Sequence, residues 1–474
     1  MSVHKSVKMP DIPVDIQAYD NSDIAPIRRF PWLTPRHEIL FVIGWLSLFT
    51  LMSIFVSNPF MSETSASASP DYAHVMFLHG LLIGMVGLMA LLTCQILCLQ
   101  STHTRQWITG GVLAATILAA VGGIWDRSIP GSEVAMWTQI FGFFALDEIL
   151  IVLLVGMVNE WKINAINTRT IPFYASFLAA GSMLVAAIMG HLAGWIMEFG
   201  VNAPPALGNF SKFAGFGSGS DFAAALVGSH SHEMAVAAMG LTVLLLSVQF
   251  GYRSLTGGTK IAARIGASMI GFGVIAMTLI YSIAAISQWQ IPTYFVNGAN
   301  GIAGDDIVTG VFVMGGGVIL ALAVAINAII KHLRLPALYV SAWTWILSFS
   351  MVVIGGFAIE MHEAYFGAGD PAAKGAVNDA VFTWLHQDIG LFLLPAIVLA
   401  LIAAQRLISG KIELISLITL AGVTITFIGG IVFVFLSPAT YGAGYIVTTL
   451  GLLGIGAAIA ATLWYGAAGS EKAR

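Results

Sequence analysis

Residues 74–99 read HVMFLHGLLIGMVGLMALLTCQILCL, an apolar run without any Lys, Arg, Asp or Glu. A run of about 20 apolar residues is long enough to cross the hydrocarbon core of a bilayer as a helix. A helix also bonds its backbone N–H and C=O groups within the segment, so none is left unsatisfied in lipid. The stretch therefore predicts a membrane-spanning helix.

The composition of the whole chain agrees with this interpretation. The chain has 474 residues, of which 58% are hydrophobic and only 9% charged, and its formal net charge is −4. Ordinary soluble proteins carry about 25% charged residues, which cover their surface. The composition excludes a soluble globular enzyme, a disordered chain and a nucleic-acid binder. It predicts a polytopic membrane protein with lipid as its main surroundings.

Further apolar stretches of similar length recur along the chain and complete a prediction of twelve spans, all α-helical. Residues 1–37 are expected to form a polar cytoplasmic N-terminal arm, 38–466 the membrane domain and 467–474 a cytoplasmic tail. The predicted spans are 38–57, 74–99, 106–125, 134–158, 172–198, 228–250, 262–287, 305–330, 338–361, 380–405, 414–436 and 443–466.

The basic residues predict the orientation of these spans. Of the 20 Lys and Arg residues, all but Arg127, Lys212 and Lys374 fall on one side of the predicted helices. Cytoplasmic loops carry the excess of Lys and Arg, so this side is expected to face the cytoplasm. Both termini then lie in the cytoplasm, and the expected location is a bacterial-type inner (cell) membrane.

Histidines form the second pattern. Seven of the eleven fall near the outer ends of predicted spans: His74, His79, His191, His230, His232, His362 and His386. His79 and His232 are 153 residues apart, and His232 and His386 are 154 apart. Each of these three lies near the outer start of the second span of a set of four, which predicts a threefold repeat of four helices.

Two interpretations of the histidine layer stay open. Each histidine taken alone is most simply an interfacial side chain, hydrogen-bonded at headgroup depth. Polar residues inside membrane spans usually face a functional site, and this favours a ligand role for His79, His232 and His386 taken together. Imidazole at such a depth suits haem iron.

The segment His79-Gly80-Leu81-Leu82-Ile83-Gly84-Met85 resembles the second membrane helix of subunit I of haem–copper oxidases and the related nitric oxide reductases. That family has twelve core helices with threefold pseudosymmetry. The resemblance implies that His79 binds a low-spin haem b. The tenth helix of the family carries His-x-His, and here the corresponding residues are Trp384-Leu385-His386. His386 is then the implied second axial ligand, and Trp384 stands where the family binds its active-site haem.

The chain departs from the family at the second metal. The seventh helix of the family carries a His-His pair, and a placement on Pro292 puts Ala284 and Ala285 at those positions. The string Ser229-His230-Ser231-His232-Glu233-Met234 does not match the spacing of the sixth helix. The resemblance thus implies a retained low-spin haem and an oxygen-reducing centre that is lost or rebuilt.

A rebuilt centre would draw on the imidazoles and carboxylates of the outer layer, which suit copper or non-haem iron. Residues i and i+2 of a helix point about 200° apart, so His230 and His232 are not expected to hold one ion together. The repeat favours His232 as the inward one. The candidate metal ligands are His191, His230, His232 and His362, and Glu233 is a candidate catalytic residue beside them.

Asp147 and Glu148 are adjacent carboxylates in the middle of the predicted span 134–158. Two unpaired carboxylates cannot both stay ionised in hydrocarbon at low cost. One interpretation makes them catalytic candidates, with one of them protonated in a proton or water path, or hydrogen-bonded to a cofactor or a partner subunit. The other has one of them hydrogen-bonded to a Ser, Thr or Trp of a neighbouring helix.

The function expected from these features is redox work in the membrane, with electrons passing through a bis-histidine b-type haem. Reduction of a small molecule such as oxygen or nitric oxide at a second centre would make the protein an oxidoreductase. Other subunits, for example a cytochrome c or a copper-domain protein, are the expected partners. Three alternatives remain: a non-catalytic electron relay or assembly subunit, a haem and copper protein of the nitric oxide response, and a twelve-span secondary transporter.

Overall fold

A computed structural model describes residues 35–56, 72–97, 99, 102–128, 133–163, 168–199, 219–287, 307–366, 384–408, 410–433 and 441–468. The chain divides into two units, Met1–Thr34 and Pro35–Arg474, and all the described residues belong to the second. The predicted arm therefore lies almost entirely outside the described residues, as does most of the predicted tail.

Every regular element in the described part of the chain is a helix. Three of them, η3, η4 and η5, are π-helical segments, each continuous with an α-helix. The elements are α1 (Pro35–Val56), α2 (Tyr72–Ile96), α3 (Thr102–Ser128), α4 (Glu133–Ile163), α6 (Ile171–Phe199), α8 (Gly219–Gln249), η2 (Tyr252–Ser254), α9 (Gly257–Ser287), η3 (Ile307–Gly315), α11 (Gly316–Ile330), α12 (Pro336–Phe366), η4 (Trp384–Leu393), α14 (Leu394–Leu407), α15 (Ile412–Phe427), η5 (Ile428–Phe433) and α17 (Tyr441–Ala468).

Ten helices among the described residues are long and apolar enough to cross a membrane. This confirms the prediction of an all-α, multi-pass membrane protein. The predicted spans 38–57 and 106–125 coincide with α1 and α3, which are helices but are not among the ten. The count of twelve spans therefore stays a prediction.

Three membrane segments form the interior of the helix bundle. In α2, α8 and the continuous helix η4–α14, between 83% and 94% of the apolar window is buried, against 39–61% in the other seven candidate spans. These three segments contact one another, and α2 also contacts η4 directly. These three segments are therefore the most deeply buried of the candidate spans.

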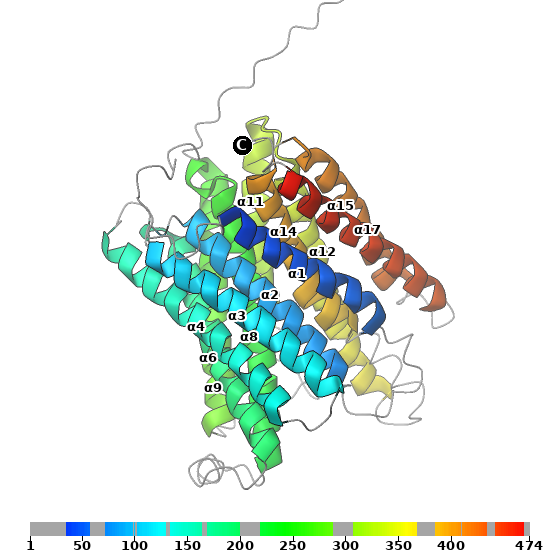
Figure 1. Cartoon of the computed structure of the whole chain (residues 1–474). Coiled ribbons are helices and arrows are strands. Elements are labelled where there is room, and N and C mark those ends of the chain that lie inside the picture. The colour runs from blue at the N-terminus through cyan, green and yellow to red at the C-terminus, as the bar shows by residue number, and fades with distance from the viewer. Residues whose placement is uncertain are drawn as a thin grey trace, which may run out of the picture. The chain divides into compact units, whose positions relative to one another are not determined.

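Close approach of neighbouring helices depends on small residues, as is usual where lipid supplies no hydrophobic driving force. Helices α3 and α4 lie side by side (Figure 1). A Cβ atom on Gly122 of α3 would lie 2.6 Å from the backbone nitrogen of Gln139, and one on Gly142 of α4 would lie 2.6 Å from that of Ala119. Each glycine therefore makes room for the backbone of the other helix.

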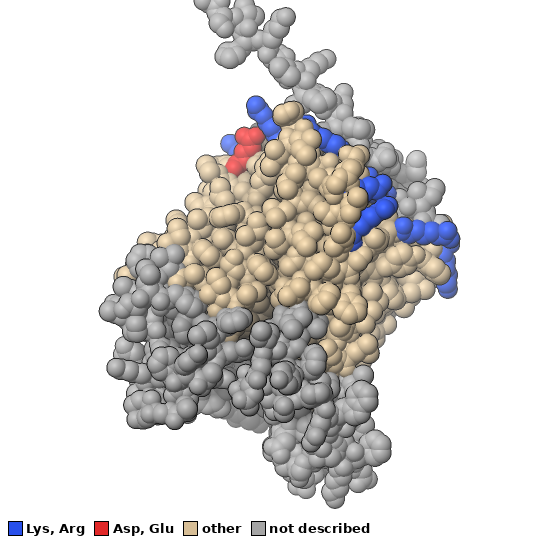
Figure 2. Space-filling model, turned by 180° about the vertical axis from the view of Figure 1, so that it is seen from behind, with Lys and Arg blue, Asp and Glu red and all other residues tan. Residues whose placement is uncertain are grey.

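Several connections between helices meet at one end of the bundle. Lys331, after α11, donates from Nζ to the carbonyl oxygen of Ser254, which follows α8, at 2.7 Å. Arg406, at the end of α14, donates to Oε1 of Gln249, at the end of α8, at 2.6 Å. Figure 2 shows Lys and Arg side chains gathered toward one end of the face it draws, with uncharged surface beside them.

Candidate functional site

His79 of α2 and His230 of α8 lie together where these two interior helices meet. Their ring centroids are 6.1 Å apart and their planes differ by 13°. The Nδ1 atom of His230 lies 2.8 Å from the carbonyl oxygen of Ala186 on α6. A carbonyl can only accept, so Nδ1 carries the proton and the lone pair of the neutral ring is at Nε2. Gly190 makes this possible, because a Cβ there would lie 2.5 Å from Nδ1.

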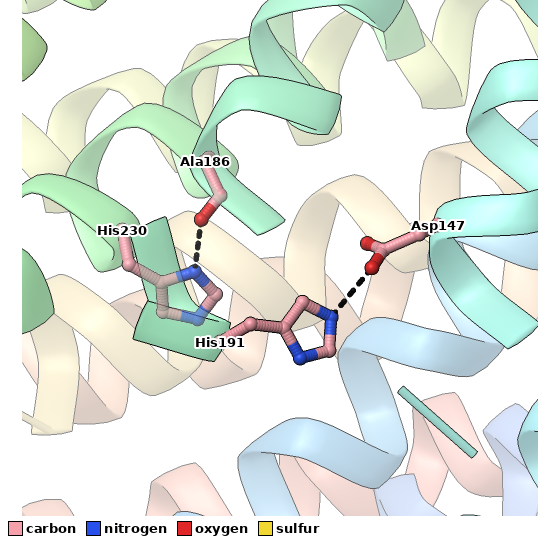
Figure 3. Close-up of polar contacts among 4 residues, drawn as sticks. All are labelled: Asp147, Ala186, His191 and His230. Carbon is pink, nitrogen blue, oxygen red and sulfur yellow. Dashed lines mark hydrogen bonds and ion pairs between the residues drawn. The ribbon is translucent and has the colours of Figure 1, made fainter. Parts of the chain in front are cut away.

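His191 of α6 pairs with Asp147 of α4. Its Nε2 atom lies 2.7 Å from Oδ2 of Asp147 (Figure 3). The two side chains are 20% and 15% exposed. Oδ1 of Asp147 is buried and has no hydrogen-bond partner in the described part of the chain. The pair joins two membrane helices by a bond between titratable groups, so this carboxylate is not isolated in hydrocarbon.

Two phenylalanines of α4 connect the histidines. The ring of Phe144 stacks on that of His191, with centroids 4.9 Å apart and planes 18° apart. The centroid of Phe143 lies 6.3 Å from that of His191 and 5.2 Å from that of His79. Phe143 is therefore in ring contact with both His79 and His191. Asp147 follows these phenylalanines by three and four residues, which places all three on one face of a helix.

His386 lies in the π-helical segment η4, a type of helix that is frequent at functional sites. Its Nδ1 atom lies 2.8 Å from the carbonyl oxygen of Val352 on α12. Two glycines of α12 pack against His386. A Cβ on Gly355 would lie 3.0 Å from the Cβ of His386, and a Cβ on Gly356 would lie 3.3 Å from Cε1 of its ring. His230 makes a similar contact. Each of the two rings donates to a carbonyl, that of Ala186 or Val352, and a glycine that faces the ring, Gly190 or Gly356, follows four residues later.

His232 faces a different neighbour from His230. Its ring stacks on Tyr281 of α9, with centroids 5.3 Å apart and planes 10° apart, and its Nδ1 lies 3.5 Å from Oγ of Ser231. The prediction that these two histidines diverge agrees with the structure. The repeat favoured His232 as the inward one, but the ring beside His79 is that of His230. The spacing of 153 residues did not reveal this, because two residues along a helix change the direction of the side chain by about 200°.

For the remaining candidate residues the structure gives burial or position along a helix. Glu233 is buried on α8 with 1% of its surface exposed, and Glu148 is half-buried on α4. His362 falls in α12 and Trp384 begins η4, but their side chains lie outside the described ones, as do those of His74, Ala284 and Ala285.

No group of three or more His, Cys, Asp or Glu side chains among the described residues is arranged to hold a metal ion. Among the described residues, no three of the metal ligands predicted from the sequence therefore form one site. Sequence reasoning missed Phe143, Phe144 and the carbonyls of Ala186 and Val352. The spacing of Phe143, Phe144 and Asp147 could have indicated the first two. The carbonyls leave no signal in the sequence.

The fold and the polar cluster define a multi-pass helical membrane protein with histidines inside its bundle. No protein-family model, curated protein or solved structure matches the chain. The function therefore has to be argued from the residues themselves.

Proposed function

We propose that the chain is a membrane redox protein that holds one b-type haem between His79 and His386. The observation that carries the proposal is the hydrogen bond from Nδ1 of His386 to the carbonyl oxygen of Val352. Histidines that bind metals usually donate their other ring N–H to a carbonyl or carboxylate, which fixes the tautomer and the ring orientation. In His386 this bond leaves the lone pair at Nε2, the atom an iron would need.

Two features of the residues around these histidines support the proposal. His79 and His386 lie on α2 and η4, which are interior segments in contact with each other. Gly355 and Gly356 leave room on α12 for the backbone and the ring of His386. A bound haem would supply reversible one-electron chemistry. The protein's part would be to orient the imidazoles and to exclude water with the apolar interior.

The helix contacts support a twelve-span bundle of three four-helix sets. The last helix of each set contacts the first helix of the next: α4 contacts α6, α11 contacts α12, and α17 contacts α1. The second helices of the sets, α2, α8 and η4–α14, meet in the interior. The proposed architecture is therefore a ring of three units around the histidine-bearing helices, similar to that of oxidase subunit I.

The same proposal includes orientation and partners. The Lys and Arg residues at one end of the bundle support a cytoplasmic assignment of that end, with both termini on the cytoplasmic side of a bacterial-type cell membrane. Lipid would cover the outward faces, and an electron carrier such as a cytochrome c or a copper-domain subunit would dock from outside. Reduction of oxygen or nitric oxide at a second centre of copper or non-haem iron stays a prediction from the sequence.

A visible spectrum of the purified protein tests the proposal. We expect a sharp reduced b-type band and one haem per chain, and we expect His79→Ala and His386→Ala each to lose the low-spin signal. His103→Ala, which removes an exposed histidine of α3, is the control and should leave the spectrum unchanged. A protein without haem, or an unaltered pigment in both variants, would overturn the proposal.

A further inference from the structure

The outward face of α4 carries a regular series of exposed apolar side chains. Between residues 134 and 158, every described side chain that is exposed belongs to this series: Val134, Trp137, Phe141, Phe144, Ile151, Val155 and Val158. Their exposed fractions run from 36% to 58%. Helix α4 is also the least buried of the ten candidate spans, with 39% of its apolar window buried. The series therefore points away from α2, α3 and α6, the helices against which α4 packs.

Glu148 fills the one gap in the series. It follows Phe144 by four residues and precedes Ile151 by three, so it shares their face of the helix. Glu148 is the central residue of α4, and its side chain is half-buried. Its neighbour Asp147 contacts His191 of α6, whereas no hydrogen bond or ion pair joins Glu148 to another described residue. A carboxyl group thus sits at mid-membrane depth on an otherwise apolar outward face.

A carboxyl group at this depth is costly unless it has a partner. The neighbouring spans offer no cation there. Helix α6 has no Lys or Arg, and those of α3 are Arg105 and Arg127, near its two ends. A hydrogen bond to another membrane helix is the remaining way to satisfy the group, and such bonds hold membrane helices together.

The spacing of the series fits such a helix. With Glu148 included, its members alternate in steps of three and four residues from 134 to 158. This alternation is the seam of two helices wound around each other in a left-handed sense. Membrane helices pack mostly in this way, at crossing angles near +20°. At 1.5 Å per residue the series is about 36 Å long, which covers the hydrocarbon core of a bilayer.

We propose that this face of α4 binds the same face of a second copy of the chain, with Glu148 of each copy hydrogen-bonded to the other. A twofold axis normal to the membrane brings identical faces together, so a residue at the axis meets itself. A neutral carboxyl group has both a donor and an acceptor, so two of them satisfy each other without a net charge in lipid. The pairing does not depend on haem.

The first experiment is oxidative cysteine crosslinking in the membranes of the expressing cells, with the unmodified chain as background. Phe141→Cys, Ile151→Cys and Val155→Cys should give a product of two chains, identified by mass spectrometry. Val152→Cys, half-buried beside the series, and Phe272→Cys, 58% exposed on α9, should give no more than the background. Equal yields at 151, 152 and 272, or a product with a different protein, overturn the proposal.

The second experiment counts subunits of the purified chain in liposomes at decreasing protein density. Glu148→Leu should weaken association about tenfold, the scale of an interhelical hydrogen bond or two. Glu148→Gln keeps a donor and an acceptor, and Glu133→Gln removes an exposed carboxyl at the end of α4, so both should associate as the unmodified chain does. A monomer at every density, or a Glu148→Leu variant that associates normally, overturns the proposal. Should Glu148→Leu fail to fold, the crosslinks decide.

Discussion

The Nδ1 atoms of His230 and His386 make the same contact, each 2.8 Å from a backbone carbonyl oxygen of the helix that precedes its own. The carbonyls belong to Ala186 on α6 and Val352 on α12, and a glycine follows each of them on the same helix, Gly190 and Gly356. Both rings are therefore held in one tautomer by an acceptor that cannot rotate away.

Gly356→Val should displace His386. A Cβ at this position would lie 3.3 Å from Cε1 and 3.5 Å from Nδ1 of the ring, and the branches of valine need more room still. The ring should turn away from Val352, and the haem absorption should lose its low-spin form. Ile354→Ala, an exposed residue of the same helix, is the matched control. A low-spin spectrum in Gly356→Val equal to that of the control would contradict this prediction.

Gly190→Ala should destabilise the contact between α6 and α8. The added Cβ would lie 2.5 Å from Nδ1 of His230, so the bond to Ala186 has to break or the helices have to separate. Overpacking of this kind costs about 1–3 kcal/mol. Thermal unfolding in detergent should show the loss. Gly181→Ala, where a Cβ meets nothing within 4 Å on the same helix, should be neutral. Equal melting temperatures for the two variants would refute the proposed contact.

Gly122→Ala should weaken the contact between α3 and α4. Its Cβ would lie 2.6 Å from the backbone nitrogen of Gln139, and a backbone cannot move aside as a flexible side chain does. We expect a cost of about 1–3 kcal/mol, visible as a lower unfolding temperature. Gly110→Ala, at an open position of α3, serves as the comparison. The prediction fails if both variants unfold at the temperature of the unmodified chain.

Tyr252 should contribute a pH dependence at alkaline pH. It lies in η2, between the candidate spans that end at Gln249 and begin at Gly257. Burial raises the pKa of Tyr252 above its ordinary value of 10, against a smaller opposing effect of Arg264. The unfolded chain then loses this proton first, so the stabilisation is present below pH 10 and is lost as pH rises through the folded-state pKa.

Unfolding of Tyr252→Phe and of the unmodified chain should be compared between pH 8 and about 11. The difference between the two isolates Tyr252 from the lysines that titrate in the same range. We expect the variant to lose less stability as the pH rises. A loss of equal size in both proteins would mean that this hydroxyl does not titrate differently on folding.

The sequence pointed to some residues of the candidate site but not to the contacts between them. The apolar runs predicted the helices, and the histidine positions predicted a layer near their outer ends. Asp147 was recognised as a carboxylate that needs a partner, and a hydrogen bond to a neighbouring helix was one of the two interpretations. The sequence does not identify the partner, since that interpretation names a Ser, Thr or Trp and the structure has His191 of α6.

What the amino-acid sequence determined by itself is the class of protein. A run such as 74–99 has too few polar groups to be stable in water, and its length suits a bilayer whatever its neighbours are. The tertiary structure decided which side chains meet. His230, and not His232, lies beside His79, and His191 is the partner of Asp147. Both contacts depend on how each helix is rotated about its axis and on which helix packs against it. Those quantities arise from contacts between distant segments, so no local pattern contains them.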